Sequence, residues 1–375
     1  MRGLVTSSTA PIRVLIVDDS AVIRGALGRI IDAERDMTVA TTAPNGRLAL
    51  DALKHTKVDV VLLDVEMPEM DGITALPRIL SGYPDTRVIM ASSITQSGAE
   101  VTLQALALGA ADYITKPAAR SGSSTLAAMQ AEIVAKVRAI GRAAHGRSAR
   151  LGTGAASKNT AGTAGGTAYT PPSALLASKH GNAAPRVLTI ASSTGGPNAL
   201  AEVLSGLPSD FPLPVLITQH MPAVFTGLLA QRLERDCGRP CTEAVDGEPI
   251  LANHTYVAPG GFHMIVRTEE AKPYIQLTVT EPENYCRPSA DPMFRSVSSI
   301  YGASTLAVVL TGMGDDGMRG ARAIHERGGR VLVQDEATSV VWGMPGAVAN
   351  AGLASAILPL SAIAEAIQAS CGVPV

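Results

Sequence analysis

Residues 186–197 read RVLTIASSTGGP, and this stretch decides the fold of the second half of the chain. An apolar, β-branched run stops at small hydroxyl residues and two glycines, and a helix-compatible segment follows over 198–207. In an open α/β sheet, ligands bind in the crevice beyond the carboxyl end of a strand, and a helix N-terminus there offers unpaired N–H groups to negative charge. A serine in this turn could act as a nucleophile if a base reaches it. On its own, the stretch fits a phosphate-binding turn or a plain connection better.

Strands and helices alternate on both sides of this stretch. The strands that we expect after it lie at 214–219, 306–310 and 330–334, and the helices at 223–236, 291–301, 317–327 and 360–370. The strands that we expect before it lie at 12–17, 37–42, 58–63, 87–91 and 111–114, each followed by a helix, the last over 125–141. Regular alternation is typical of parallel sheets covered by helices. The sequence therefore predicts an α/β fold with two doubly wound, mostly parallel-sheet domains. A β-rich segment over 250–280 adds an antiparallel hairpin to the second domain.

The composition divides the chain into two domains and a linker. We expect the first domain over 12–141 and the second over 185–371, which suits a length of 375 residues. Between them, residues 142–184 are rich in Gly, Ala, Ser and Thr and lack hydrophobic periodicity, which predicts a flexible linker.

Charge and cysteine usage exclude several classes of function. A net charge of −2 and a pI near 6.4 give no electrostatic basis for binding nucleic acid or a membrane surface. The four cysteines form no CxxC pair and no zinc pattern, so we expect free thiols in a reducing compartment. Neither a signal peptide nor a membrane span is evident, which predicts a cytoplasmic protein without membrane insertion.

Acidic and cationic side chains close several strands of the first domain. Asp18 and Asp19 follow the first strand and Asp64 follows the third, while Ser92 and Lys116 follow the last two. Three neighbouring carboxylates repel each other unless a cation joins them, and oxygen ligands suit Mg²⁺. A hydroxyl and an ammonium group at the same edge could hold the oxygens of a phosphorylated aspartate. The alternative for each aspartate by itself is ordinary helix capping.

On these residues, segment 12–141 resembles the receiver domain of two-component response regulators. The resemblance implies that Asp64 is the phosphoacceptor and that a histidine kinase is the phosphodonor. It also implies a Mg²⁺ site formed by Asp18, Asp19, Asp64 and the backbone carbonyl of Glu66. The family's switch positions fall on Ser92, Tyr113 and Lys116; for Tyr113, ordinary strand packing is the alternative.

A second set of polar residues closes the strands of the second domain. Ser193 follows the first strand, His220 follows the next, and Asp315 and Asp316 follow the strand over 306–310. If these strands are neighbours, a nucleophile, a base and a carboxylate meet at one sheet edge, because a serine needs a base and the base needs an orienting acid. The order Ser, His, Asp differs from that of α/β-hydrolases. By itself, His220 fits an ordinary loop histidine better than a base, and Asp315 and Asp316 could simply shape a Gly-rich turn.

The second domain resembles the catalytic domain of the chemotaxis protein-glutamate methylesterase (CheB) family. The matching segments are ASSTGG (191–196), TQHMP (218–222), APGGFHM (258–264), RPSAD (287–291) and LTGMGDDG (310–317). By this resemblance Ser193, rather than Ser192, is the nucleophile and His220 is the base. Asp316, rather than Asp315, is the orienting acid. The oxyanion site includes the backbone amide of Met313, and His263 is a candidate for the wall of the site.

The resemblance implies a phosphorylation-gated serine hydrolase that needs no cofactor for hydrolysis. Its substrates would be methyl-accepting chemotaxis receptors, whose glutamate methyl esters it demethylates and whose glutamines it deamidates. None of the cysteines lies in a strand-end turn with a histidine, so we expect no cysteine nucleophile. The alternative is a response regulator whose output domain is catalytically vestigial and acts as a binding module.

Overall fold

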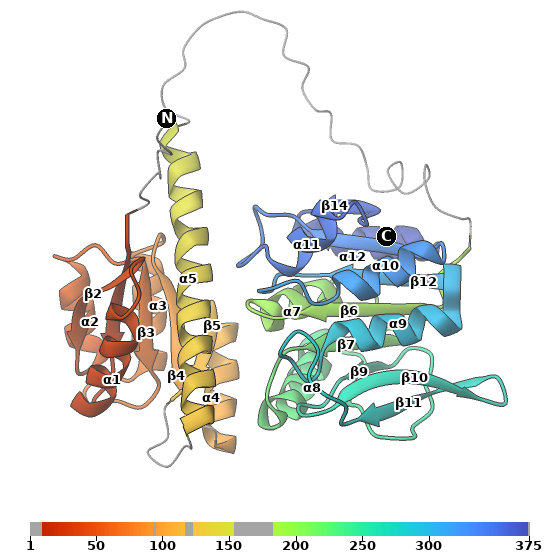
Figure 1. The fold of residues 1–375 in the computed structure, drawn as a ribbon, viewed down its shortest axis with the longest axis horizontal. Coiled ribbons are helices and arrows are strands. Elements are labelled where there is room, and N and C mark those ends of the chain that lie inside the picture. The colour runs from red at the N-terminus through yellow and green to blue at the C-terminus, as the bar shows by residue number, and fades with distance from the viewer. Residues whose placement is uncertain (1–9, 93–94, 117–122, 154–182, 374–375) are drawn as a thin grey trace, which may run out of the picture. The chain divides into compact units, whose positions relative to one another are not determined.

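The chain forms two compact units, residues 1–157 and 158–375, in a computed structural model that describes residues 10–92, 95–116, 123–153 and 183–373 (Figure 1). Both units are α/β folds, as the alternating pattern predicts. Among the described residues, no helix is long and apolar enough to cross a bilayer.

The first unit is a five-stranded parallel sheet with the strand order β2-β1-β3-β4-β5. The strands are β1 (Ile12–Val17), β2 (Met37–Ala43), β3 (Val60–Asp64), β4 (Arg87–Ser92) and β5 (Asp112–Thr115). The helices are α1 (Ala21–Asp32), α2 (Gly46–Leu53), α3 (Gly72–Gly82), α4 (Gln96–Ala107) and α5 (Ser123–Thr153). Helices α1 and α5 contact each other, as do α2 with α3 and α3 with α4, so helices cover both faces of the sheet.

Local sequence fixes where four of these helices begin. A polar residue precedes each helix, and its side chain accepts a hydrogen bond from an amide of the first turn, which satisfies a donor that has no helical partner. These capping residues are Ser20, Asn45, Asp71 and Thr95.

Helix α5 is longer than predicted. The pattern predicts an end at residue 141, but the helix continues to Thr153, so residues 142–153 of the predicted linker are helical. Ala144, one turn after the buried Ile140, is also buried, so the apolar stripe extends past 141, and the Ala- and Arg-rich sequence after it favours helix. Residues 154–182 of the predicted linker lie outside the described residues.

The second unit contains a seven-stranded parallel sheet with the order β14-β13-β12-β6-β7-β9-β8. Its strands are β6 (Val187–Ser192), β7 (Val215–Gln219), β8 (Cys241–Glu243), β9 (Thr255–Val257), β12 (Thr305–Val309), β13 (Arg330–Gln334) and β14 (Ala356–Leu358). Its helices are α7 (Gly196–Ser205), α8 (Ala223–Cys237), α9 (Ala290–Tyr301), α10 (Met318–Glu326), α11 (Met344–Asn350) and α12 (Leu360–Cys371). A separate antiparallel hairpin, β10 (His263–Glu269) with β11 (Lys272–Thr278), confirms the predicted hairpin.

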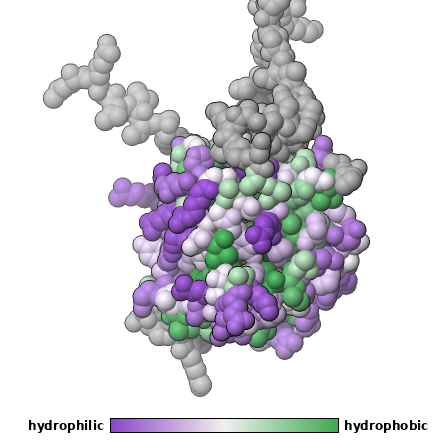
Figure 2. Space-filling view, turned by 90° about the vertical axis from the view of Figure 1, so that its right-hand side faces the viewer, coloured by the Kyte–Doolittle hydropathy of each residue, from purple (hydrophilic) through white to green (hydrophobic). Residues whose placement is uncertain are grey.

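Strand β6 lies at the centre of the seven-stranded sheet, in the core of the second unit. Every residue of β6 is buried, and its neighbours β7 and β12 are buried along their whole lengths. On the face shown in Figure 2, hydrophobic residues are scattered among hydrophilic ones, which is ordinary for a protein surface. The sheet edge beyond β6, β7 and β12 carries the polar residues that the sequence singles out.

Candidate functional site

Three loops of the second unit meet because their strands are neighbours. Strand β6 pairs with β12 on one side and with β7 on the other, as the sequence-based argument required. The amide of Ser193 donates to the carbonyl of Thr311, 3.0 Å away, and the amide of His220 donates to the carbonyl of Ser192 over 3.2 Å. These backbone bonds hold the loops that carry Ser193, His220 and Asp316 against one another.

The turn after β6 distinguishes its two serines. Ser192 is fully buried, and its hydroxyl donates to Oε1 of Gln219 over 2.7 Å, whereas Ser193 is half-buried. Gly195 has a φ of 78°, a left-handed conformation that favours glycine. A Cβ on Gly196 would lie 1.9 Å from Oε1 of Gln219, so this turn has room only for glycine. The small residues of the motif therefore bring the backbone close to Gln219 and leave Ser193 facing outward.

Asp316 is the centre of the hydrogen-bond network. Its Oδ2 lies 2.7 Å from Nε2 of His220, and the aspartate is buried. The remaining donors to its carboxylate are Ser289 Oγ at 2.7 Å, Asn284 Nδ2 at 2.8 Å, and the amides of Ala290, Asp291 and Gly317 at 2.7, 3.2 and 2.9 Å. Burial favours the neutral acid, but the bonds from His220 and the other donors outweigh it and hold the pKa of Asp316 far below its usual range. The exposed Asp315 takes no part in this network.

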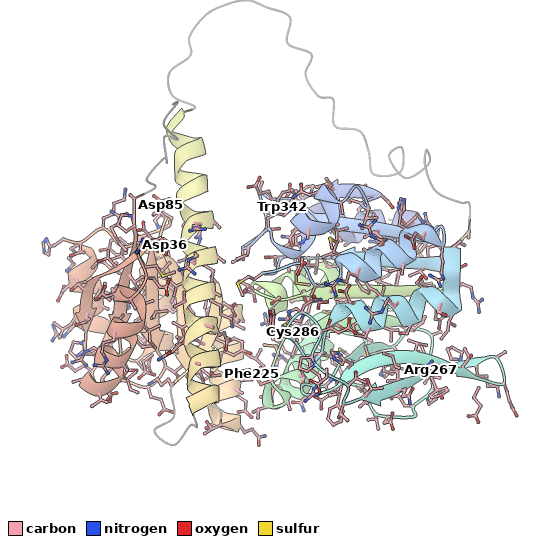
Figure 3. All side chains as sticks on the ribbon, viewed as in Figure 1. Asp36, Asp85, Phe225, Arg267, Cys286 and Trp342 are labelled. Atoms are coloured by element: carbon pink, nitrogen blue, oxygen red, sulfur yellow. The ribbon has the colours of Figure 1, made fainter. Side chains whose placement is uncertain are left out.

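His220 is held at both ring nitrogens. Burial lowers its pKa, but the hydrogen bond to Asp316 and the contact with Cys286 raise it more, to about 10. The Sγ of Cys286 lies 3.5 Å from Nδ1, and Cys286 is labelled in Figure 3. In the part of the chain that the structure describes, no hydrogen bond joins His220 to Ser193. Both contacts, with Asp316 and with Cys286, therefore favour the imidazolium form of His220 over the neutral ring.

The loop after β12 passes beside the serine at Gly312, the residue before Met313. A Cβ on Gly312 would lie 2.9 Å from Cβ of Ser193, so the loop passes directly beside that side chain. The backbone amides of Gly312, Gly343 and Met344 donate to backbone carbonyls, whereas the amide of Met313 has no hydrogen-bond acceptor among the described residues. Gly314 has a φ of 86°, which turns the chain sharply after Met313. An amide in this position can bind an oxyanion.

The loop between β11 and α9 supplies residues that the sequence-based argument missed. Asn284 contacts Asp316 and Cys286 contacts His220, and both lie outside every motif quoted above, whereas Ser289, which also contacts Asp316, belongs to the segment RPSAD (287–291). His263 is fully buried, and its Nδ1 accepts a hydrogen bond from the backbone amide of Ser289 over 3.2 Å. It therefore helps to hold this loop in place.

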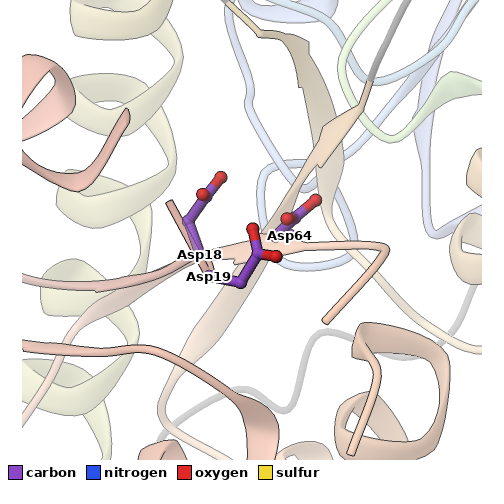
Figure 4. Close-up of side chains that lie close together, drawn as sticks. All are labelled: Asp18, Asp19 and Asp64. Carbon is purple, nitrogen blue, oxygen red and sulfur yellow. The ribbon is translucent and has the colours of Figure 1, made fainter. Parts of the chain in front are cut away.

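Three acidic residues of the first unit lie close together at the carboxyl ends of its strands. Strands β1 and β3 are adjacent, and carboxylate oxygens of Asp18, Asp19 and Asp64 lie within 4.8 Å of one another (Figure 4). The Nζ of Lys116 lies 2.6 Å from Oδ1 of Asp64 and 3.0 Å from Oδ2 of Asp18. The structure thus brings together the residues that the sequence predicted to meet.

Asp64 is both buried and incompletely satisfied. Burial raises its pKa in spite of the nearby Lys116, and its Oδ2 has no hydrogen-bond partner among the described residues. An unpaired, buried carboxylate oxygen is costly, and a divalent cation with oxygen preference would satisfy it. The residues present therefore fit Mg²⁺.

The other residues of this edge are also in place. The hydroxyl of Ser92 is buried and donates to the carbonyl of Gly98 over 3.1 Å. The ring of Tyr113 is buried, and the Nζ of Lys136 lies 4.7 Å from its centroid.

Comparisons with known proteins divide the chain in the same way. Residues 188–367 match the family model of the CheB methylesterase, and residues 14–126 match that of the response regulator receiver domain. A protein-glutamate methylesterase/protein-glutamine glutaminase of group 2 operon from Rhodospirillum centenum is 46% identical, covering 96% of this chain and 93% of the relative. A protein-glutamate methylesterase/protein-glutamine glutaminase from Azospirillum brasilense is 45% identical, covering 96% and 92%.

Two solved structures from Thermotoga maritima are similar to the separate units. The CheB methylesterase catalytic domain is 38% identical with a TM-score of 0.48, covering 50% of this chain and 99% of that one. The response regulator domain of CheB is 44% identical with a TM-score of 0.30, covering 34% and 94%.

Proposed function

Because the chain belongs to the CheB methylesterase family, we propose that Ser193, His220 and Asp316 carry out its reaction. The protein is a protein-glutamate methylesterase and protein-glutamine glutaminase with a receiver domain, and it acts in chemotaxis. The observation that carries the assignment of residues is the 2.7 Å pair of His220 and Asp316 beside the half-buried Ser193, at the ends of three adjacent strands.

The reaction would proceed through an acyl-enzyme. Ser193 attacks the side-chain carbonyl of a methylated glutamate while His220 takes the hydroxyl proton. Asp316 holds the ring through Nε2, so Nδ1 is the nitrogen that serves Ser193. The amide of Met313 stabilises the oxyanion. His220 then protonates the departing methoxide, which leaves as methanol. A water molecule that gives its proton to His220 attacks the acyl-enzyme, and the ester bond to Ser193 breaks to release the glutamate. With glutamine, the leaving group is ammonia.

The substrates would be methyl-accepting chemotaxis receptors, whose signalling segments the protein would meet in the cytoplasm. The alternative, a vestigial output domain, would be favoured by the loss of a catalytic residue. The chain retains all three, namely Ser193, His220 and Asp316.

The receiver domain would regulate this reaction through Asp64. A histidine kinase would donate the phosphoryl group, and Asp18, Asp19, Asp64 and the carbonyl of Glu66 would hold Mg²⁺. The cation would neutralise charge on the phosphoryl oxygens. Lys116 and Ser92 would bind the phosphorylated side chain, and Tyr113 would respond as the third switch residue. Phosphorylation would shift the population of the enzyme toward its active state.

The assignment can be tested by methanol release from receptor membranes that carry labelled methyl esters. Ser193→Ala should reduce the rate by about 10⁴-fold or more, because the acyl-enzyme no longer forms. The matched control is Ser192→Ala, which removes a neighbouring hydroxyl that is bonded to Gln219 and should retain most of the activity. Equal rates for Ser193→Ala and wild type would exclude the serine mechanism.

A second measurement tests regulation in the same assay. A small phosphodonor with Mg²⁺ should accelerate the wild type but leave Asp64→Asn at its basal rate. Acceleration of Asp64→Asn by the phosphodonor would contradict the assignment of the phosphoacceptor.

A further inference from the structure

The thiol of Cys286 occupies the ring nitrogen that the mechanism needs. Asp316 holds Nε2 of His220, so Nδ1 is the nitrogen that remains for a proton from Ser193. In the structure this nitrogen faces Sγ of Cys286 at 3.5 Å. A thiol beside an imidazole is an acid–base pair, because the proton can lie on either partner and the charge on one partner favours the opposite charge on the other.

The loop around Cys286 is fixed on both sides, so the contact is part of the fold. Before the cysteine, the side-chain Nδ2 of Asn284 donates to carboxylate oxygens of both Asp291 and Asp316. The backbone φ values of Asn284 and Tyr285 are 53° and 62°. Two successive non-glycine residues in this conformation are strained, and the surrounding contacts must hold them there. After the cysteine, the carbonyl of Arg287 accepts a bond from the amide of Gly261.

We propose that Cys286 is a positioning residue that competes with Ser193 for Nδ1 of His220 and stabilises the protonated, resting form of the base. This inference rests on the proposed role of His220. It adds to that role a cause for the resting state. His220 can take the proton of Ser193 only after the imidazolium has returned its Nδ1 proton to the sulfur of Cys286 or to solvent.

The other charged groups around His220 are already paired. Asp316 lies on the opposite ring nitrogen, with its carboxylate filled by donors. Asp291 accepts a bond from the amide of Gly320, and Arg295 forms an ion pair with Glu283. On the Nδ1 side, the ionisable partner among the described residues is Cys286. Its removal therefore withdraws a stabilising partner from the imidazolium while burial still opposes the charge.

The test is a pair of pH titrations on the full-length protein. The variants are Cys286→Ala, the nearly isosteric Cys286→Ser, and the control Cys371→Ser, which replaces a thiol at the end of α12. One readout is the acid limb of methanol release, and the other is the titration of the His220 ring by NMR, assigned with a His220→Gln spectrum. Both Cys286 variants should titrate at lower pH than wild type, by about one unit, and the acid limb of methanol release should move by the same amount. Cys371→Ser should match wild type.

The outcomes separate this inference from the proposed function. Unchanged ring titration in both Cys286 variants would overturn the inference. So would a shift in Cys286→Ala alone, since it would trace the effect to the space filled by the side chain rather than to an ionisable thiol. Shifted ring titrations in proteins that release no methanol, wild type included, would support the Cys286–His220 pair and reject the proposed function.

Discussion

Asp64 and Asp316 are both buried aspartates at the carboxyl edge of a parallel sheet, but their surroundings act in opposite directions. The carboxylate of Asp64 contacts Lys116 through Oδ1 and leaves Oδ2 without a hydrogen-bond partner among the described residues, and burial raises its pKa. The carboxylate of Asp316 receives hydrogen bonds at both oxygens, which lower its pKa in spite of burial.

The difference follows from what each carboxylate is proposed to do. A carboxylate that accepts a phosphoryl group must keep an oxygen available, and it bears the cost of incomplete solvation in the resting state. A carboxylate that orients a histidine must stay ionised and in one place, which a set of hydrogen-bond donors achieves. Similar positions on similar sheets thus hold a reactive and an orienting aspartate.

The largest effect should come from Asp316→Asn. An amide cannot accept the bonds that Asp316 makes through both oxygens, and it leaves His220 without its charged partner, so methanol release should fall by about 10⁴-fold. The adjacent and exposed Asp315→Asn is the matched control and should stay within a factor of two or so of wild type. If both variants retained similar rates, Asp316 would not be the orienting acid.

A smaller effect should come from Ser289→Ala, which removes one donor from the Asp316 carboxylate. The loss of one charge-assisted hydrogen bond, about 1.5 kcal/mol, should lower the rate by about tenfold. The control Ser298→Ala removes a buried hydroxyl of helix α9 that donates to the carbonyl of Ala323. It should cost comparable stability in thermal unfolding but leave the rate unchanged. A loss of activity in both variants would show that the effect comes from α9 and not from the carboxylate.

The smallest effect should be a stabilisation of the first unit by Asp64→Asn. Because the folded-state pKa of Asp64 is raised, its ionised form opposes folding at neutral pH, and this cost disappears below the unfolded pKa of about 3.9. The Tm of the first unit should therefore rise by about 3 °C at pH 7 and be unchanged near pH 3. Asp51→Asn is the control, since its carboxylate is exposed and its pKa is lowered by Lys54. A lower Tm for Asp64→Asn at pH 7 would mean that Lys116 outweighs burial.

Much of this architecture follows from the sequence because long buried strands leave a clear pattern. The stretches that end in Asp64 and Ser192 are mostly apolar and buried throughout, and polar residues mark where each strand stops. The strands β8, β9 and β14 have three residues each, too few to show a period, and β8 and β14 were not predicted. The predicted helix ending at 141 was wrong because α5 continues through a segment whose composition resembles a linker.

The sequence by itself determined the strand-end positions of Ser193, His220 and Asp316, because apolar runs and turn residues are local signals. Only the tertiary structure decided that Asp316 binds Nε2 of His220 and that Cys286 faces Nδ1. Those contacts join segments 66 and 96 residues apart in the chain, and no periodicity records which side chains meet when loops from separate strands fold onto one edge. The local sequence shows which residue types follow each strand, whereas the protonation of His220 depends on how a loop distant in the sequence packs against its ring.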